Sequence, residues 1–123
     1  MFQYAAKILR IVDGDTLSLD IDLGFYVRTV QTVRLAGIDT PETVKFRVGG
    51  IVDPAAQYVA RMTPIGSACV VEISRAEKYG RWLARILYLP GETDRAEILR
   101  QPRVLNDELV REGLAKNYSG GKK

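Results

Sequence analysis

Hydrophobic and polar residues alternate strictly along residues 16–23, where every second side chain is leucine or isoleucine. A period of two is typical of a β-strand with one buried face. Residues 4–12 predict a strand before it, and residues 27–38, rich in β-branched side chains, predict a strand after it. Turn residues at positions 13–15 and at Gly24 separate the three strands. The first half of the chain is therefore predicted to form a β-meander.

The second half opens with a helix signal at Asp53 and Pro54. Aspartate is a preferred helix cap, and proline is favoured at the first helical position. Apolar side chains then recur at helical spacing until Pro64, which together with a following glycine ends the helix. Two further strands are predicted over residues 68–74 and 81–89.

The predicted order is three strands, a helix, two strands and a final short helix. Asn106 is the expected cap of that last helix, and Gly113 its expected end. Five short strands with a helix between the third and fourth match an OB-type barrel, whereas a ferredoxin-like sandwich needs a crossover helix after its first strand. We therefore predict one mainly β domain over residues 1–118, a five-stranded OB-type barrel with two short packed helices, and a flexible tail over residues 119–123.

The composition fits a globular domain, since the 123 residues are 46% hydrophobic and 27% charged. The chain contains no histidine and a single cysteine, Cys69, which the strand pattern places in the core. Within the chain, these facts exclude a Ser-His-Asp triad, a Cys-His pair, a His/Cys zinc site and a disulfide. Any chemistry must come from carboxylates, arginines, lysines, hydroxyls or a metal ion bound by oxygen.

The formal net charge of +3 is distributed unevenly, because acidic residues slightly outnumber basic ones before residue 60 and basic ones predominate after it. This split fits a cation site beside an anion-binding surface, and it equally fits a solvated surface of uneven charge. No apolar run approaches the ~18 residues needed to span a bilayer, so no membrane partner is predicted. The N-terminus lacks the layout of a signal peptide, so we expect a cytoplasmic protein; a leader removed earlier would leave no trace.

Two motifs place acidic residues at strand ends. In IVDGDT, Asp15 follows the first turn and can present a carboxylate to a cation, although Asp and Gly are also ordinary turn residues. In VRLAGIDTPE, Arg34 lies within a strand, and Asp39 and Glu42 follow its end, where Pro41 holds an extended turn. Two acids held close together are unfavourable unless a cation or an arginine lies between them. The alternative for this second motif is an exposed polar turn.

A third motif, EKYGR, places Lys78, Tyr79 and Arg81 in a tight turn. Basic side chains beside an aromatic ring suit a phosphate and a base, and the alternative is a polar hairpin loop. The fourth motif, LNDELVREGLAK, covers the last predicted helix and the segment after it. By itself this motif indicates a structural role and not a catalytic one.

Together these four motifs resemble the staphylococcal nuclease (thermonuclease) family, in the same order and over residues 7–116. The fold of that family is an OB barrel with packed helices, in agreement with the predicted fold. The resemblance implies a calcium-dependent nuclease that hydrolyses phosphodiester bonds of DNA and RNA, the 5′ oxygen leaving to give 3′-phosphate ends. A non-catalytic module of the same family that binds nucleic acid or protein is the alternative, and the complete set of ion and arginine positions favours the nuclease.

The functional residues of the family match positions in this sequence. The resemblance implies that Asp15 and Asp39 bind Ca²⁺ through their carboxylates, and Thr40 through its backbone carbonyl. The residues that it implies for catalysis are Arg34 and Arg81, which hold the scissile phosphate, and Glu42, the general base. The residues that it implies for substrate binding are Lys78 and Tyr79, at a terminal phosphate, and Tyr118, near a base pocket.

Several regions depart from the family pattern. The hairpin between Asp15 and Arg34 is longer, and residues 43–53 are shorter and lack a lysine-rich loop. Residues 89–103 are an extra segment, for which a longer loop is favoured over an arm that grips substrate. The sequence stops soon after Tyr118, so the family's C-terminal helix is missing. Because an uncovered apolar patch often marks a subunit contact, we expect a homo-oligomer formed through that surface, or the extra segment folded over it.

Overall fold

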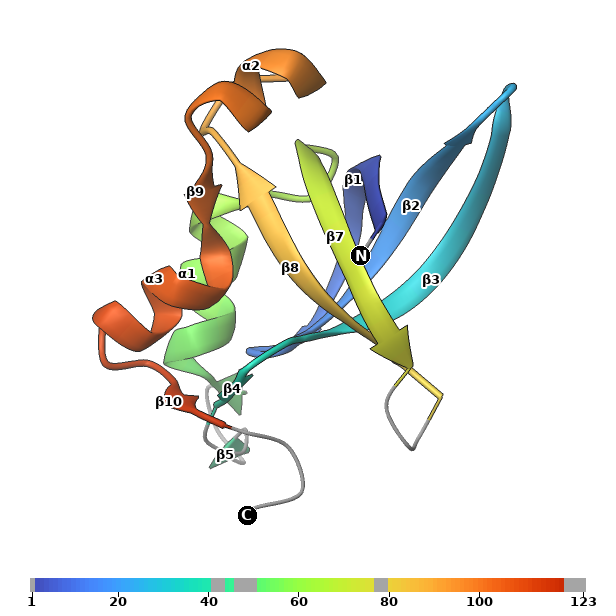
Figure 1. Ribbon diagram of the computed structural model, residues 1–123. Helices are drawn as coiled ribbons and strands as arrows, with labels where there is room; N and C mark the ends of the chain where they lie inside the picture. The colour runs from blue at the N-terminus through green and yellow to red at the C-terminus, as the bar shows by residue number, and fades with distance from the viewer. Residues whose placement is uncertain (1, 41–43, 46–50, 77–79, 119–123) are drawn as a thin grey trace.

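The computed structural model describes residues 2–40, 44–45, 51–76 and 80–118 (Figure 1). The strands are β1 (Phe2–Asp13), β2 (Thr16–Gly24), β3 (Val27–Leu35), β4 (Ile38–Asp39), β5 (Val44–Lys45), β6 (Ile51–Val52), β7 (Ala68–Ala76), β8 (Trp82–Tyr88), β9 (Arg103–Val104) and β10 (Lys116–Asn117). The helices are α1 (Pro54–Met62), α2 (Arg95–Arg100) and α3 (Leu105–Arg111). In this part of the chain, no helix combines the length and the apolar composition that a membrane crossing needs.

Five long strands close into a barrel in the order β3-β2-β1-β7-β8 (Figure 1). Each neighbouring pair in that order is antiparallel, and a parallel pairing of β3 with β8 joins the two ends. In this closing pair, Val33 lies beside Trp82 and Arg34 lies beside Leu83. The predicted five-stranded OB-type barrel is therefore confirmed.

The alternating side chains of the strands fill this barrel. Large apolar side chains from several strands are fully buried, among them Leu17, Leu19, Leu35 and Ile86. Cys69, expected in the core, is 2% exposed, and burial raises the pKa of its thiol to about 12. Burying a side chain of the Leu or Ile kind stabilises the fold by about 1.5–3 kcal/mol relative to exposure. The barrel thus gives the residues on its outer face a firmly packed base.

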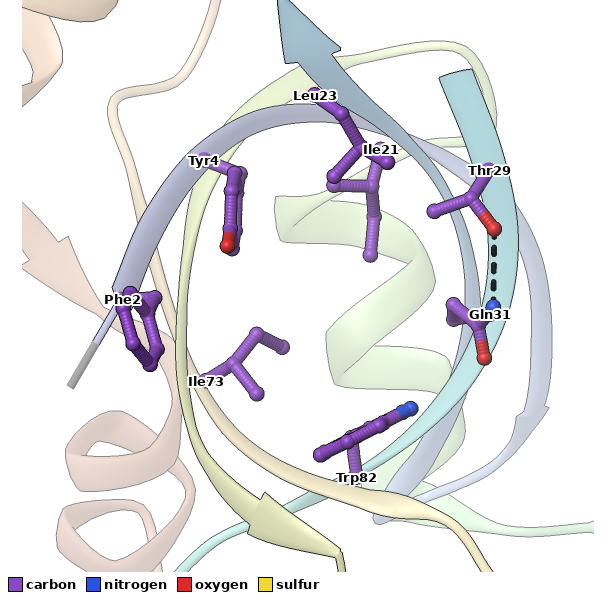
Figure 2. Close-up of a pocket in the computed structure, with 8 residues that line it drawn as sticks. All are labelled: Phe2, Tyr4, Ile21, Leu23, Thr29, Gln31, Ile73 and Trp82. Atoms are coloured by element: carbon purple, nitrogen blue, oxygen red, sulfur yellow. Dashed lines mark hydrogen bonds between the residues drawn. The ribbon is translucent and has the colours of Figure 1, made fainter. Parts of the chain in front are cut away.

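Helix α1 closes one end of the barrel, and Figure 2 shows it through the opposite, open mouth. Its start follows the signal in the sequence: the Asp53 carboxylate accepts a hydrogen bond from Ala56 N at 3.0 Å, and Pro54 is the first helical residue. Tyr58 and Val59 bury their side chains against the strands. The predicted start of this helix is confirmed.

Helix α3 begins earlier than predicted, and Asn106 does not cap it. The Asn106 side chain is buried: its Oδ1 accepts from Ile86 N at 3.1 Å, and its Nδ2 donates to the carbonyl oxygens of Ala36 at 2.9 Å and Ala84 at 3.0 Å. The amide therefore satisfies backbone groups around β8 and the end of β3, far away in the sequence. The end of the helix is as predicted, because Gly113 has a φ of 75°, the left-handed conformation that glycine favours.

The extra segment at residues 89–103 is not the long loop that the sequence favours. It contains α2, where the Asp94 carboxylate accepts from Ala96 N at 3.2 Å, and it leads into β9, which pairs with β8. Ile98 of α2 is 1% exposed and packs with Val70 in a small second cluster. The described residues thus hold three helices where two were predicted, because a helix of six residues has little apolar periodicity of its own.

A buried carboxylate, that of Glu108 in α3, connects helices α1 and α3 with strands β8 and β9. Its Oε1 accepts from Tyr58 OH at 3.2 Å and from the Tyr88 hydroxyl, and its Oε2 pairs with Arg103 Nε at 2.5 Å. Burial by itself raises the pKa of Glu108, but the bonds from Arg103 and Tyr88 outweigh burial and lower the pKa below its usual value. The carboxylate is therefore held charged in the interior.

Candidate active site

The turn between β1 and β2 presents Asp15 at one end of the barrel. The Asp15 amide donates to Asp13 Oδ1 at 3.2 Å, and Thr16 Oγ1 donates to Asp15 Oδ1 at 3.1 Å. Gly14 is buried against α1, and a Cβ added there would lie 2.6 Å from the Cβ of Ala55. Only glycine permits this contact, so the position of the turn is fixed by helix α1.

Arg34 of β3 brings together the two carboxylates expected to bind metal. Its Nη2 lies 3.4 Å from Asp15 Oδ2 and 3.1 Å from Asp39 Oδ1. The amide of Thr40 also donates to Asp15 Oδ2, at 3.4 Å. The side chains of Arg34 and Asp15 are 14% and 13% exposed, so water screens this cluster only in part. The structure thus gathers Asp15, Asp39 and Thr40 around Arg34.

The residues after α3 return to the same place. Strand β10 pairs with β4, so that Lys116 lies beside Asp39, and Tyr118 N donates to Gly37 O at 2.8 Å. The Tyr118 ring lies over the Arg34 guanidinium, with its centroid 5.5 Å from Cζ. A cation and an aromatic face attract each other at this distance. The tyrosine expected at the base pocket therefore lies against an arginine expected to hold phosphate.

Asp13 and Asp15 differ in their electrostatic surroundings. Burial by itself raises the pKa of Asp15, but its contact with the Asp13 side chain and the charge of Arg34 outweigh burial and lower that pKa. The pKa of Asp13 is raised, first by burial and then by its contact with Asp15. Asp15 therefore stays ionised at neutral pH, as a ligand of a cation must.

A groove of about 240 Å³ lies beside this cluster, over β3, β8 and β7. Arg34, Leu83 and Arg75 line it and stand in one row, because Leu83 pairs with Arg34 on one side and with Arg75 on the other. Neighbouring strands lie about 4.8 Å apart, so the backbones of the two arginines are about 10 Å apart. No motif in the sequence singles out Arg75, since only the pairing register shows that it stands beside Leu83.

Five other residues considered from the sequence are Arg81, Trp82, Glu42, Lys78 and Tyr79. Arg81 directly precedes β8 and is partly buried. Trp82 lines an apolar cavity at the barrel mouth (Figure 2). Glu42, Lys78 and Tyr79 lie outside the described residues, so their roles stay predictions.

The residues at this cluster suit a cation that binds oxygen. Asp15 and Asp39 both contact one nitrogen of Arg34, so their carboxylates converge. Ca²⁺ takes carboxylate and backbone carbonyl oxygens, and Thr40 directly follows Asp39 in the chain. Among residues 2–40, 44–45, 51–76 and 80–118, no three His, Cys, Asp or Glu side chains form a metal-binding group. The backbone carbonyl of Thr40 and water are further oxygen ligands that would suit an ion bound by the two carboxylates.

Comparison with known proteins gives one family. A family model described as Staphylococcal nuclease homologue matches residues 32–123. The chain is 32% identical to a thermonuclease of Staphylococcus hyicus over 115 residues, which covers 89% of this chain and 57% of the relative. It is also 32% identical to a thermonuclease of Staphylococcus intermedius over 114 residues, with 89% and 56% covered. The chain thus spans little more than half the length of these relatives. Because the family model matches most of the chain, the protein belongs to the staphylococcal nuclease homologue family.

Proposed function

We propose that this protein is a calcium-dependent nuclease that hydrolyses phosphodiester bonds of DNA and RNA, with the 5′ oxygen leaving to give 3′-phosphate ends. The observation that supports it best is the convergence of Asp15 and Asp39 on Arg34, beside a groove that a second arginine lines. The similarity to two thermonucleases supports the same class of reaction.

The proposed ligands of Ca²⁺ are the Asp15 and Asp39 carboxylates and the Thr40 carbonyl. When bound, the ion would offset charge on the phosphodiester and orient a water molecule. The lowered pKa of Asp15 keeps its carboxylate charged at neutral pH. The Thr40 amide donates to Asp15 Oδ2, and this hydrogen bond holds residues 39–40 next to Asp15.

Arg34 and Arg81 are proposed to hold the scissile phosphate. Both ion pairs of Arg34 with the carboxylates use Nη2, whereas a guanidinium carries five N–H donors. Arginine keeps its charge, and one guanidinium can bind two phosphate oxygens at once. Both properties suit the extra negative charge of a five-coordinate transition state. Arg75 of β7 pairs with Leu83 of β8 and lines the same groove. We propose that it binds the next phosphate along the bound nucleic acid.

Glu42 is proposed as the general base that orients or deprotonates the attacking water. Lys78 and Tyr79 are proposed to hold a terminal phosphate, and the ring of Tyr118 to face a base beside Arg34. This scheme uses carboxylates, arginines and oxygen ligands throughout, and it fits a chain without histidine.

The test is digestion of circular single-stranded DNA, linear double-stranded DNA and RNA, with Ca²⁺ or with EDTA. We expect cleavage with Ca²⁺, none with EDTA, and recovery when Ca²⁺ is added back. Glu42→Gln and Arg81→Ala should each slow cleavage by roughly 10²-fold or more. Asp22→Asn, at an exposed aspartate that pairs with Arg28, is the matched control.

A purified Glu42→Gln/Arg81→Ala double variant that cuts like the wild type would show the proposal to be wrong. Salt-dependent binding of nucleic acid without cleavage under any of these conditions would identify the alternative, a non-catalytic OB-fold module.

A further inference from the structure

The β2–β3 hairpin ends in two aromatic residues that face solvent. Phe25 and Tyr26 are 97% and 104% exposed, and their φ values are 56° and 62°. Two-residue hairpin loops with positive φ at both positions favour Asn-Gly, because bulkier residues strain the left-handed conformation. The expected turn residue, Gly24, directly precedes this tip. Bulky aromatic side chains at strained, exposed positions indicate a contact outside the single folded chain.

Next to this tip, one edge of β3 is open. Strand β2 pairs with β3 from Val27 to Arg34, whereas β8 pairs with it only from Val33 to Leu35. Within the described part of the chain, residues 27–32 therefore have a strand on one side only, and Figure 1 shows β3 as the outer strand of a projecting hairpin. The backbone N–H and C=O groups of such an edge can bind another extended chain.

The open mouth of the barrel adjoins that edge. Its cavity of about 330 Å³ is lined largely by apolar side chains such as Phe2, Leu23 and Trp82, together with Thr29 and Gln31 of the open edge (Figure 2). Phe2 is 66% exposed and Trp82 is 39% exposed. An apolar recess of this kind can accept aromatic side chains.

We propose that two copies of this chain form a dimer by antiparallel pairing of residues 27–32 in the two β3 edges, around a two-fold axis. Antiparallel pairing places the tip of each copy beside the residues that follow position 32 in the other copy. The first of these is Val33, whose neighbour in β8 is Trp82 at the cavity. Phe25 and Tyr26 of each copy then pack at the Trp82 end of the other cavity, and the contact forms twice.

Charge favours a second copy over a nucleic acid at this edge. Arg28 of the edge lies 2.8 Å from Asp20 and 3.7 Å from Asp22, and Lys7 stands beside Asp20 in the β1–β2 register. These four charges balance, so the surface neither attracts a polyanion nor repels a copy of itself. An edge whose charges balance and which exposes the apolar side chains of Val27 and Val30 suits a symmetric dimer.

Sedimentation of the metal-free protein over concentrations of roughly 1 µM to 1 mM tests this dimer. We expect a monomer–dimer equilibrium for the wild type. Phe25→Asn/Tyr26→Gly should raise the dimer dissociation constant by about tenfold or more. The same change should leave thermal stability equal or higher, because Asn-Gly adopts positive φ easily. Val30→Lys, which places a charge on the open edge, should weaken the dimer without touching the turn.

Ile65→Asn is the matched control, because Ile65 is an exposed apolar residue outside the hairpin, at 68% exposure. It should leave the dissociation constant unchanged. The inference is wrong if the wild type stays monomeric throughout the concentration range, or if both hairpin variants dimerise as the wild type does. Loss of nucleic-acid affinity by the tip variant, with a monomeric wild type, would assign the tip to substrate and also overturn the dimer.

Discussion

The carboxylate–arginine clusters at Glu108 and at Arg34 have similar chemistry and opposite surroundings. Glu108 is 3% exposed, and its oxygens accept from two tyrosine hydroxyls and from Arg103. At Arg34, two carboxylates pair with one guanidinium nitrogen at the side of a groove, and the Asp39 side chain is 26% exposed. A carboxylate satisfied by donors from several elements holds a fold together, whereas two acids that pair with one arginine beside solvent suit an incoming cation.

The largest effect is expected when the two carboxylates that contact Arg34 are neutralised. In Asp15→Asn/Asp39→Asn, we expect cleavage with Ca²⁺ to fall by roughly 10⁴-fold, because the proposed metal ligands lose their charge. The free energy of unfolding should change by only about 1 kcal/mol, since the loss of the ion pairs with Arg34 is partly offset by the loss of repulsion between the two carboxylates. Gel assays and urea unfolding measure the two effects. A stable variant that cleaves at the wild-type rate would contradict the assignment.

The matching change in the buried cluster is Glu108→Gln. It removes the buried charge that pairs with Arg103, whose own side chain is 40% exposed, so we expect the free energy of unfolding to fall by about 2 kcal/mol. Urea unfolding measures the loss, and Glu112→Gln, at an exposed position of the same segment, is the control. A change as small as that of the control would mean that the buried cluster adds little to stability.

The pH dependence of stability sharpens the same contrast. The pKa of Glu108 is lower in the folded protein than its ordinary value of 4.5, so its contribution is present above pH 4.5 and is lost as the pH falls through the folded-state pKa. In the folded protein, the pKa of Tyr58 and that of Tyr88 are raised above 10.0. The two tyrosines therefore add to the free energy of unfolding below pH 10.0, and this contribution is lost as the pH rises through the folded-state pKa values.

Urea unfolding from acidic to alkaline pH should therefore give a stability curve that falls at both ends. In Glu108→Gln both falls should be smaller. The fall at acidic pH comes from the Glu108 carboxylate itself, and that carboxylate, after burial, also raises the pKa of both tyrosines. Curves of the same shape for wild type and variant would show that other groups set the pH dependence.

The smallest expected effect concerns the groove. Arg75→Gln should weaken binding of a short oligonucleotide by about three- to tenfold and should lower the slope of log affinity against log salt by about 0.7–0.9, as loss of one phosphate contact does. Arg10→Gln, at an exposed arginine of β1, should leave the slope unchanged. Cleavage of a substrate with a single phosphodiester should stay at the wild-type rate, which distinguishes Arg75 from Arg34 and Arg81, the arginines proposed to act in catalysis.

Features that depend on local spacing could be predicted from the sequence. The alternation in residues 16–23 predicts β2, and the pair Asp53 and Pro54 predicts the start of α1. Arg34 and Asp39 fall within one motif of the sequence, and the structure places Arg34 Nη2 3.1 Å from Asp39 Oδ1, but their assignment to one site depends on the family resemblance. The expectation that Asp15 lies beside Arg34 and Asp39 likewise depends on the family resemblance and not on spacing in the sequence.

Features that depend on distant partners could not be predicted. Asn106 has the character of a helix cap, but backbone groups of β8 and of Ala36 engage its side chain in the folded chain. Arg75 becomes a candidate only through its register beside Leu83. Helix α2 has only six residues, and Ile98 anchors it by packing with Val70 and Leu87. These partners lie outside any short window of sequence around the helix.

The parallel pairing of β3 with β8 also has a kinetic consequence. It joins Val33 to Trp82 across a long stretch of chain, and contacts of such sequence separation form slowly, because the intervening loop must close first. The row of Arg34, Leu83 and Arg75 exists only after this closure. We therefore expect hairpins to form early and the proposed phosphate-binding surface to assemble last, so that a chain that is still folding lacks the proposed active site.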